Sequence, residues 1–277
     1  FENLKAQFDF AIAEDIGDGD HSALSSIPSE QRGKAQLIIK ENGVFAGGAL
    51  AAYLFKYIDA TATVKHFIED GALVEKGTLA LTVEGNTIKL LQSERLVLNY
   101  LQRLSGIATR TYSYARLIDH TKCTVLDTRK TTPGLRVLEK WAVALGGGGN
   151  HRMGLYDMVM LKDNHIDFAG GISKAVARTK AYLAESNRTL AIEVETRNMQ
   201  EVSAAIQAGV DRIMLDNFSI SETKEAVEYI AGRTEVESSG GITHDTLVPY
   251  AECGVDFISV GALTHHIKGL DMSLKAL

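Results

Sequence analysis

The sequence predicts an α/β protein in two parts, a small strand-rich domain followed by a larger domain in which strands and helices alternate. Short β-prone runs separated by turn signals come first, and a long stretch with apolar residues at helical spacing follows them. The remainder repeats a strand-then-helix pattern. A chain of 277 residues suffices for a β/α barrel with a small appendage, and it buries a sizeable core.

Three short runs define the strand-rich domain: Gly33–Lys40, Thr61–Glu69 and Thr78–Lys89. Turn signals such as Asn42-Gly43 and Asp70-Gly71 separate them. The stretch HFIEDGALVEKGTLALTVEG resembles half of a barrel-sandwich module of the biotinyl or lipoyl kind, but it lacks the carrier lysine motif of those modules. Because likeness of fold without the site does not carry function, we interpret this domain as scaffold.

A long helix, or a pair of helices, is predicted between Ile88 and Asp119, where apolar residues recur at helical spacing and Gly106 is the one interruption. This segment links the two domains. Arg95 and Arg103 lie two turns apart on it, and taken alone they are interpreted as solvent-facing charges.

The larger domain alternates strands with helices. β-Prone runs are predicted at Thr124–Leu126, Met158–Leu161, Leu190–Val194, Arg212–Leu215, Glu235–Glu237 and Phe257–Val260, and helices at stretches such as Asn198–Ala208, Ser221–Ala231 and Thr243–Cys253. The segments QAGVDRIMLDN and ECGVDFISVGA repeat one signature, a helix end followed by Gly, Val, Asp and a strand. Such alternation predicts a parallel sheet, either a β/α barrel or an open doubly wound sheet.

Polar residues follow each predicted strand. They are Asp127-Thr128-Arg129-Lys130, Lys162-Asp163-Asn164-His165, Glu195-Thr196-Arg197-Asn198, Asp216-Asn217, Ser238-Ser239-Gly240-Gly241 and Gly261-Ala262. In β/α barrels the reactive groups occupy this face, and a phosphate commonly rests on glycine-rich loops after the last strands. SSGGIT and SVGALTH fit that phosphate role, although a Gly-Gly pair alone is equally consistent with a tight turn.

Basic residues gather between positions 127 and 166, although the net charge of the chain is −6. They are Arg129, Lys130, His151, Arg152 and Lys162, and they stand beside apolar runs. Arg and Lys at strand ends suit a small substrate with several negative groups. The acidic balance gives no indication of a nucleic-acid or membrane partner, so we expect a small-molecule ligand.

Two carboxylates end successive predicted strands. Glu195 and Asp216 therefore come close to the glycine loops, where Mg²⁺ bridging phosphate oxygens is chemically sensible. Glu193 points to the same side of its strand as Glu195, one layer deeper, and is expected to support the site. The alternative is that these carboxylates form structural ion pairs with Arg129, Lys162 or Arg212.

Compartment and minor features follow from composition. Cys123 and Cys253 are far apart and lack metal-ligand spacing, which favours free thiols in a reducing cytoplasm. No apolar run reaches the length of a membrane span, and the N-terminal stretch lacks signal-peptide character, so a cytoplasmic location is expected.

The acidic EDIGDGDH segment lacks calcium-loop spacing and is interpreted as a turn at a helix boundary. His265 and His266 are interpreted as surface or interface residues.

Several long motifs resemble one family. DTRKTTPGLR, GGGGNHRMGLYD, KDNHI, IEVET, LDNF and SSGGIT, in this order, resemble the quinolinate phosphoribosyltransferases, the decarboxylating nicotinate-nucleotide pyrophosphorylases of de novo NAD synthesis. EDIGDGDHS and ERLVLNYLQRLSGIATRT also resemble the N-terminal portion of that family. The resemblance spans the chain, and motifs of this length are far more specific than a lone glycine fingerprint.

The resemblance implies an N-terminal α/β sandwich-like domain with the linking helix, residues 1–110, and an incomplete parallel β/α barrel, residues 111–277. A C-terminal helix is expected to be able to pack back on the first domain. The resemblance further implies Mg²⁺ as the cofactor and a homodimer with shared active sites.

It also implies roles for individual residues. Arg129, His151, Arg152 and Lys162 would hold the two carboxylates of quinolinate, and Arg95 would reach in from the partner subunit. Lys130 would face phosphoribosyl pyrophosphate, Glu195 and Asp216 the ribose and Mg²⁺, and Ser239, Gly240, Gly241 and Gly261 the 5-phosphate. Lys130, Lys162, Glu195 and Asp216 are the expected catalytic residues.

Two rival functions stay open at this point. A paralogous phosphoribosyltransferase, either nicotinate-specific or molybdenum-associated, would share the scaffold and use another acceptor, which the retention of all four dicarboxylate cations disfavours. A non-catalytic binding homologue would be expected to have lost Glu195, Asp216 or Lys162, and the sequence retains all three.

Overall fold

The computed structural model describes residues 1–277, which divide into two compact units. The first unit consists of Phe1–Tyr112, Pro133–Gly147 and His266–Leu277, and the second of Ser113–Thr132 and Gly148–His265. The predicted boundary after residue 110 falls close to the end of the first segment. Two later segments also belong to the first unit: the C-terminal segment was expected to pack there, whereas Pro133–Gly147 was not.

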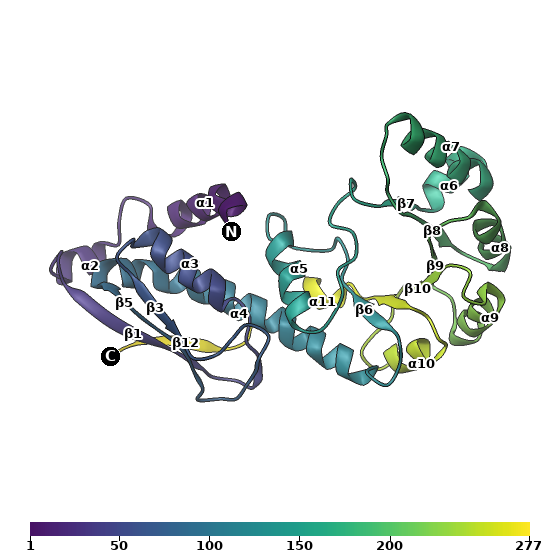
Figure 1. The fold of residues 1–277 in the computed structure, drawn as a ribbon. Coiled ribbons are helices and arrows are strands. Elements are labelled where there is room, and N and C mark those ends of the chain that lie inside the picture. Colours follow the sequence, from purple (N-terminus) through teal and green to yellow (C-terminus); the bar gives the residue numbers. More distant parts are fainter. The chain divides into compact units, whose positions relative to one another are not determined.

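The first unit contains a four-stranded antiparallel sheet in the order β12-β1-β5-β3 (Figure 1). Its strands are β1 (Arg32–Ile39), β3 (Thr63–His66), β5 (Leu79–Asn86) and β12 (Met272–Ala276). A separate two-stranded ladder joins β2 (Gly43–Val44) to β4 (Leu73–Val74). The expectation of a C-terminal helix was wrong, because residues 272–276 extend along β1 and bury Met272.

The helices of the first unit are η1 (Glu2–Leu4), α1 (Lys5–Ile16), α2 (His21–Ser26), α3 (Gly48–Ile58) and α5 (Arg136–Leu145), with most of α4 (Thr87–Leu117). The side chain of Asp70 accepts hydrogen bonds from the first backbone amides of α3, at 2.6 Å from Gly47 N and 2.7 Å from Gly48 N. A carboxylate at a helix N-terminus satisfies amides that have no partner within the helix.

The long predicted helix is one continuous element, α4. Gly106 lies within it without interrupting it. Glycine is needed at this position because the backbone of Lys268 packs closely against the helix: a Cβ on residue 106 would lie 2.4 Å from Lys268 O. The EDIGDGDH segment is a turn between two helices, as predicted. Gly17 there has φ +56°, and the Asp20 carboxylate caps α2 by accepting from Ala23 N at 3.0 Å.

The second unit is built on a six-stranded parallel sheet in the order β6-β11-β10-β9-β8-β7. Its strands are β6 (Thr124–Leu126), β7 (Val159–Leu161), β8 (Ile192–Thr196), β9 (Arg212–Asp216), β10 (Glu235–Ser239) and β11 (Phe257–Ser259). β6 and β7 are the two edges and do not pair with each other, so the barrel is incomplete, as expected. The predicted fold class is confirmed.

Helices α6 (Asp163–Ala169), α7 (Ile172–Glu185), α8 (Met199–Ala208), α9 (Ile220–Ile230), α10 (Leu247–Glu252) and α11 (Ala262–His265) belong to this unit. Helices α7 to α10 succeed one another around the outside of the curved sheet (Figure 1). The core between sheet and helices includes the fully buried Val194, Ile213 and Ile258 of the strands. No helix of the protein combines the length and apolar composition needed to cross a membrane.

Candidate active site

A cavity of about 620 Å³ lies within the second unit. Successive side chains of a strand face opposite sides of the sheet, so every second strand residue lines the cavity. In β9, for example, Ile213 and Leu215 are fully buried in the core, whereas Met214 and Asp216 line the cavity. The same two-residue step brings Met160 and Lys162 from β7 and its end into the cavity.

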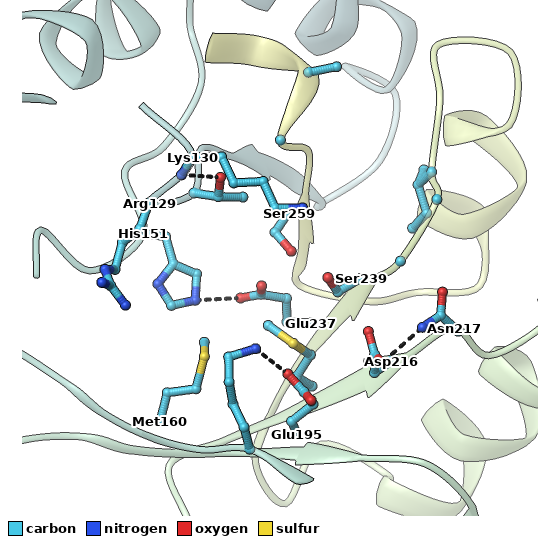
Figure 2. Close-up of a pocket in the computed structure, with 18 of the residues that line it drawn as sticks. Arg129, Lys130, His151, Met160, Glu195, Asp216, Asn217, Glu237, Ser239 and Ser259 are labelled. Carbon is cyan, nitrogen blue, oxygen red and sulfur yellow. Dashed lines mark hydrogen bonds and ion pairs between the residues drawn. The ribbon is translucent and has the colours of Figure 1, made fainter. Parts of the chain in front are cut away.

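All the predicted site residues except Arg95 line this one cavity. They are Arg129, Lys130, His151, Arg152, Lys162, Glu195, Asp216, Ser239, Gly240, Gly241 and Gly261. Figure 2 shows Glu195, Asp216, Ser239 and Ser259 coming from successive strands, with Lys130 next to Ser259. Arg95 belongs to the first unit and is exposed on α4. Its role across a subunit interface stays a prediction.

Lys162 and Glu195 form an ion pair at the ends of the neighbouring strands β7 and β8. Lys162 Nζ lies 2.5 Å from Glu195 Oε2, and the lysine side chain is 45% exposed whereas that of the glutamate is 10% exposed. One of the ion pairs considered as a structural alternative is therefore present. The pair opens into the cavity, so it is accessible to a ligand.

Asp216 stands beside Glu195 on the next strand. Burial, together with the negative charge of Glu195, raises the pKa of Asp216, although a hydrogen bond from Asn217 at 2.8 Å and the charge of Lys162 oppose this. Two carboxylates that repel each other at an open cavity wall form an all-oxygen donor set. Mg²⁺ prefers such hard oxygen ligands and binds through one or two carboxylates plus substrate phosphates, so these residues fit it.

The glycine loop after β10 needs glycine for two different reasons. Gly240 has φ +98°, and a Cβ there would lie 2.2 Å from Asn217 Oδ1. Gly241 has φ +61°, but a Cβ there meets nothing within 4 Å, so its side faces open space. Asn217 N also donates to Ser239 O at 2.9 Å, which ties this loop to the end of β9. The cavity wall at this point is consequently backbone, as an anion-binding loop requires.

Asp127, which follows β6, fixes the segment that carries two of the predicted cations. Its fully buried carboxylate accepts from His151 N at 2.9 Å and from Asn150 Nδ2 at 2.7 Å. Gly149 bridges to Leu126 in parallel, and a Cβ on Gly149 would lie 2.7 Å from Leu126 Cδ2. The segment therefore lies against the edge strand β6 and directs residues 151 and 152 into the cavity.

Arg152 is held at both of its ends. Its backbone amide donates to His151 Nδ1 at 2.6 Å, and its Nη1 donates to Met158 O at 3.3 Å. Burial and the positive charge of Arg129 lower the pKa of Arg152. Two guanidinium groups that repel each other in one cavity make a favourable place for a carboxylate, because an anion relieves that repulsion.

His151 is buried among carboxylates rather than turned fully toward the open space. Its Nε2 lies 3.1 Å from Glu193 Oε2 and 3.4 Å from Glu237 Oε2, and Figure 2 draws the contact with Glu237. Arg212 on β9 completes the group, with Nη1 at 3.1 Å from Glu237 Oε2. The candidate metal-ligand atoms of His151, Glu193 and Glu237 lie within 4.8 Å of one another, but Arg212 already supplies a positive charge there.

Protonation of this buried group follows from competing effects. Burial disfavours the imidazolium, but the adjacent carboxylates of Glu193 and Glu237 favour it and raise the pKa of His151, so the imidazole and the Glu193 carboxyl group compete for one proton. A second ring proton would have to enter at Nδ1, where the amide of Arg152 already points. Glu193 is the better place for that proton, because burial and the charge of Glu237 raise the pKa of its carboxyl group.

The cavity has further lining residues, of which Met160, Met214 and Glu237 lie outside the segments that the sequence analysis assigned to the site. The additional lining residues are Thr128, Met160, Met214, Asn217, Glu237, Ile242, Thr243, Ser259, Ala262 and His265. Strand alternation signals several of them: once Asp216 is placed, Met214 follows, and once Ser239 is placed, Glu237 follows. His265, interpreted above as a surface or interface residue, is exposed but borders the cavity.

A parallel β/α sheet with a polar cavity at the carboxyl ends of its strands defines an enzyme of the β/α-barrel class, with a site for a small polyanionic substrate. Comparison with known proteins places the chain within that class. The models named "Quinolinate phosphoribosyl transferase, N-terminal domain" and "C-terminal domain" match residues 20–105 and 107–275. The chain belongs to the quinolinate phosphoribosyltransferase family.

Individual relatives agree over nearly the whole length. The chain is 47% identical to the chloroplastic nicotinate-nucleotide pyrophosphorylase [carboxylating] of Oryza sativa subsp. japonica, over 99% of this chain and 77% of the relative. It is 41% identical to the probable nicotinate-nucleotide pyrophosphorylase [carboxylating] of Bacillus subtilis, over 98% and 92%. The crystal structure of NadC from Streptococcus pyogenes superposes with a TM-score of 0.94 at 39% identity, covering 99% of this chain and 97% of that one.

Proposed function

We propose that this protein transfers the phosphoribosyl group of phosphoribosyl pyrophosphate to quinolinate, with decarboxylation, in de novo NAD synthesis. The products are nicotinate mononucleotide, pyrophosphate and CO2. The observation that carries the proposal is that one cavity combines a cluster of cations with two carboxylates and a glycine loop. The names of the similar rice and Bacillus proteins support the same reaction.

The cations of the cavity would bind quinolinate, the acceptor of the phosphoribosyl group. Arg129 and Arg152 offer planar forks suited to carboxylates, and Lys162 adds a mobile point charge. Quinolinate carries two adjacent carboxylates, so three cations match its charge and orient its ring nitrogen toward the donor. His151 is assigned to this side by family resemblance, and its contacts with Glu193 and Arg152 favour a role in orienting the other groups.

Other residues of the same cavity suit the donor. The amides and open backbone of Gly240 and Gly241 fit the 5-phosphate, and Lys130 fits pyrophosphate oxygens. Thr264 Oγ1 donates to Lys130 O at 2.8 Å and so holds the backbone of that lysine. Glu195 and Asp216 lie at the ends of β8 and β9, between the glycine loop after β10 and Lys162 after β7, where the ribose hydroxyls and Mg²⁺ would be held. When bound, Mg²⁺ supplies charge neutralisation for the pyrophosphate.

The residues of the cavity favour a mechanism of positioning and electrostatics. The ring nitrogen of quinolinate attacks the anomeric carbon as the bond to pyrophosphate breaks, and the ribose passes through a cationic transition state. The 2-carboxylate then leaves as CO2, and the ring carbon takes up a proton. No covalent nucleophile is required, because the cations hold the acceptor and favour departure of pyrophosphate. The site itself excludes water that would hydrolyse the donor.

The direct test mixes the purified protein with Mg²⁺, phosphoribosyl pyrophosphate and either quinolinate or nicotinate, and follows mononucleotide and CO2. Product with CO2 from quinolinate alone supports the proposal. Product from nicotinate alone moves the assignment to a paralogue with another acceptor. No product from either acceptor, in a protein that still binds phosphoribosyl pyrophosphate, favours a non-catalytic homologue.

A homodimer with shared active sites is part of the proposal, and it gives Arg95 its role. Arg95→Ala and Arg152→Ala are each expected to be inactive. If Arg95 serves the site of the other subunit, a mixed dimer carries both defects in one site and none in the other. Coexpression of the two variants with different tags should then recover roughly a quarter of the wild-type activity. No recovery in an isolated mixed dimer would place both residues in the same subunit's site.

A cytoplasmic location is also a proposal. It is supported by two free cysteines and by the absence of metal-ligand spacing around them. The rice relative is named as chloroplastic and one of Nicotiana glauca as mitochondrial, so relatives are named for different compartments. Fractionation of the source cells with an antibody against the protein would test the assignment.

A further inference from the structure

We propose that Glu193 and Glu237 are positioning residues for the acceptor side of the cavity, acting through His151 on Arg152. The inference rests on the proposed function for the identity of the acceptor, quinolinate. Its geometry is independent of that identity. It assigns a purpose to two fully buried carboxylates that the proposed chemistry does not itself use.

The two glutamates that contact His151 come from the two strands that flank β9. Glu193 lies on β8 and Glu237 on β10, and β9 runs between them in the sheet. Arg212, at the start of β9, binds Glu237 through Nη1 at 3.1 Å and stacks its guanidinium over the Phe257 ring at 4.0 Å. Both carboxylates are thus fixed by the sheet, and Glu237 is also held by the largely buried Arg212.

The carboxylates determine which nitrogen of His151 carries the proton. Nε2 lies 3.1 Å and 3.4 Å from their oxygens, and two negative oxygens attract a hydrogen on Nε2 but repel a lone pair there. Nε2 therefore carries a hydrogen. Nδ1 keeps its lone pair, and the backbone N–H of Arg152 points at it over 2.6 Å. Both ring nitrogens therefore face protein groups. The carboxylates orient the ring of His151 at Nε2, and the ring orients the backbone of Arg152 at Nδ1.

Arg152 depends on this arrangement. Asp127 already holds the amide of His151, and the ring of His151 holds the next amide, so two consecutive backbone groups are fixed. The guanidinium then extends from a defined backbone to Met158 O. If the ring proton moved to Nδ1, two N–H donors would face each other, and the backbone at Arg152 would have to turn away. The guanidinium would lose the orientation that the acceptor carboxylate requires.

Glutamine at either position tests the idea with almost no change of volume. The amide of Glu193→Gln or Glu237→Gln can donate to Nε2 and so favour the opposite tautomer. We expect the KM for quinolinate to rise about tenfold, with the KM for phosphoribosyl pyrophosphate within about twofold. Glu235→Gln is the matched control, because Glu235 also binds Arg212, at 2.9 Å, but does not contact His151. It should leave both KM values unchanged.

Substitution of the histidine separates its two contacts. In His151→Asn the side-chain oxygen stands near the former Nδ1 and can still accept from the Arg152 amide. In His151→Gln the polar group stands near the former Nε2 and keeps only the glutamate contact. The proposal expects the Asn variant to retain tighter quinolinate binding than the Gln variant, measured by calorimetry.

A spectroscopic readout covers variants that lose stability. ¹⁵N-histidine NMR of the wild-type protein should show His151 with a protonated Nε2 and an unprotonated Nδ1, and Glu193→Gln should change that pattern. Three results would overturn the inference: a quinolinate KM unchanged in folded Glu193→Gln and Glu237→Gln, equal rises in both KM values, or a ring protonated at Nδ1 in the wild-type protein. Failure of the proposed function is distinguishable, because the wild-type protein would then not use quinolinate at all.

Discussion

The ammonium group of Lys162 and the carboxylate of Glu195 lie 2.5 Å apart on neighbouring strands, although the proposed reaction assigns them to different substrates. Each therefore neutralises the other in this structure. A carboxylate of quinolinate competes with Glu195 for the lysine, and the ribose and Mg²⁺ compete with the lysine for Glu195. Binding of one substrate thus removes an interaction that opposes binding of the other.

We expect positive coupling between the two substrates through this pair. Benzene-1,2-dicarboxylate has the two carboxylates of quinolinate but no ring nitrogen, so it cannot react. In the wild-type protein it should lower the Kd for Mg²⁺ and phosphoribosyl pyrophosphate about fivefold or more, measured by calorimetry. In Lys162→Met the coupling should disappear, even where binding of the dicarboxylate is detectable at high concentration. Coupling of the same size in the variant would exclude the ion pair as its source.

Arg152→Ala should abolish quinolinate turnover without unfolding the protein. The substitution removes a charge-assisted contact to the acceptor, so we expect kcat/KM for quinolinate to fall about a hundredfold or more. Arg188→Ala is a suitable control, since Arg188 is an exposed arginine of the same unit. Circular dichroism and thermal unfolding should match the wild type for both variants. A folded Arg152→Ala variant with a near-normal rate would remove Arg152 from the site.

The adjacent glycines of the loop after β10 should respond differently to alanine. In Gly240→Ala the new methyl group overlaps Asn217 Oδ1 and the backbone nitrogen of Asn217, so the free energy of unfolding should fall by about 2–3 kcal/mol. Gly241→Ala meets open space and should cost about 1 kcal/mol from its left-handed backbone alone. The methyl group nevertheless projects where a phosphate is expected, so the KM for phosphoribosyl pyrophosphate should rise. Denaturant unfolding and initial rates test both; equal stability losses would contradict this account.

Cys123 should resist alkylation in the native protein. Burial, with a smaller contribution from Asp256, raises the pKa of this thiol to about 12. The thiolate is the reactive form, so at pH 8 only about one molecule in ten thousand is reactive at equilibrium. Because the pKa is raised, labelling should increase with pH across the range 7 to 10. Iodoacetamide labelling followed by peptide mass spectrometry should show Cys253, which is less buried, reacting first. Both should react readily in urea.

Strand and helix positions in the second unit were predictable because each depends on local chemistry. β6 coincides with the predicted run, since three β-prone residues end abruptly at Asp127. α8 begins one residue later than predicted because Asn198 is its cap, accepting from Glu201 N at 3.0 Å. α10 is shorter than predicted, because Thr243 and Thr246 form a turn, with Thr243 N donating to Thr246 Oγ1 at 2.9 Å.

The site residues at the strand ends were predictable from the sequence, whereas the contacts among buried side chains below the strand ends were less so. Glu195 and Asp216 are signalled by their position after apolar runs. The contacts of Glu237 with Arg212 and His151 depend on which strands are neighbours in the sheet, and a single sequence does not specify that order. The pairing of residues 272–276 with β1 has the same origin, because an antiparallel partner more than two hundred residues away leaves no local signal.

That pairing has a consequence for synthesis on the ribosome. The chain emerges from its N-terminus, so β1, β3 and β5 are exposed long before their fourth strand exists. The second unit, apart from its last contacts, is complete by residue 265. The nascent protein thus carries an open sheet edge at β1 until β12 leaves the exit tunnel, and an unpaired strand edge attracts other chains. Ribosome-bound intermediates of this protein are accordingly expected to depend on chaperones that shield β1.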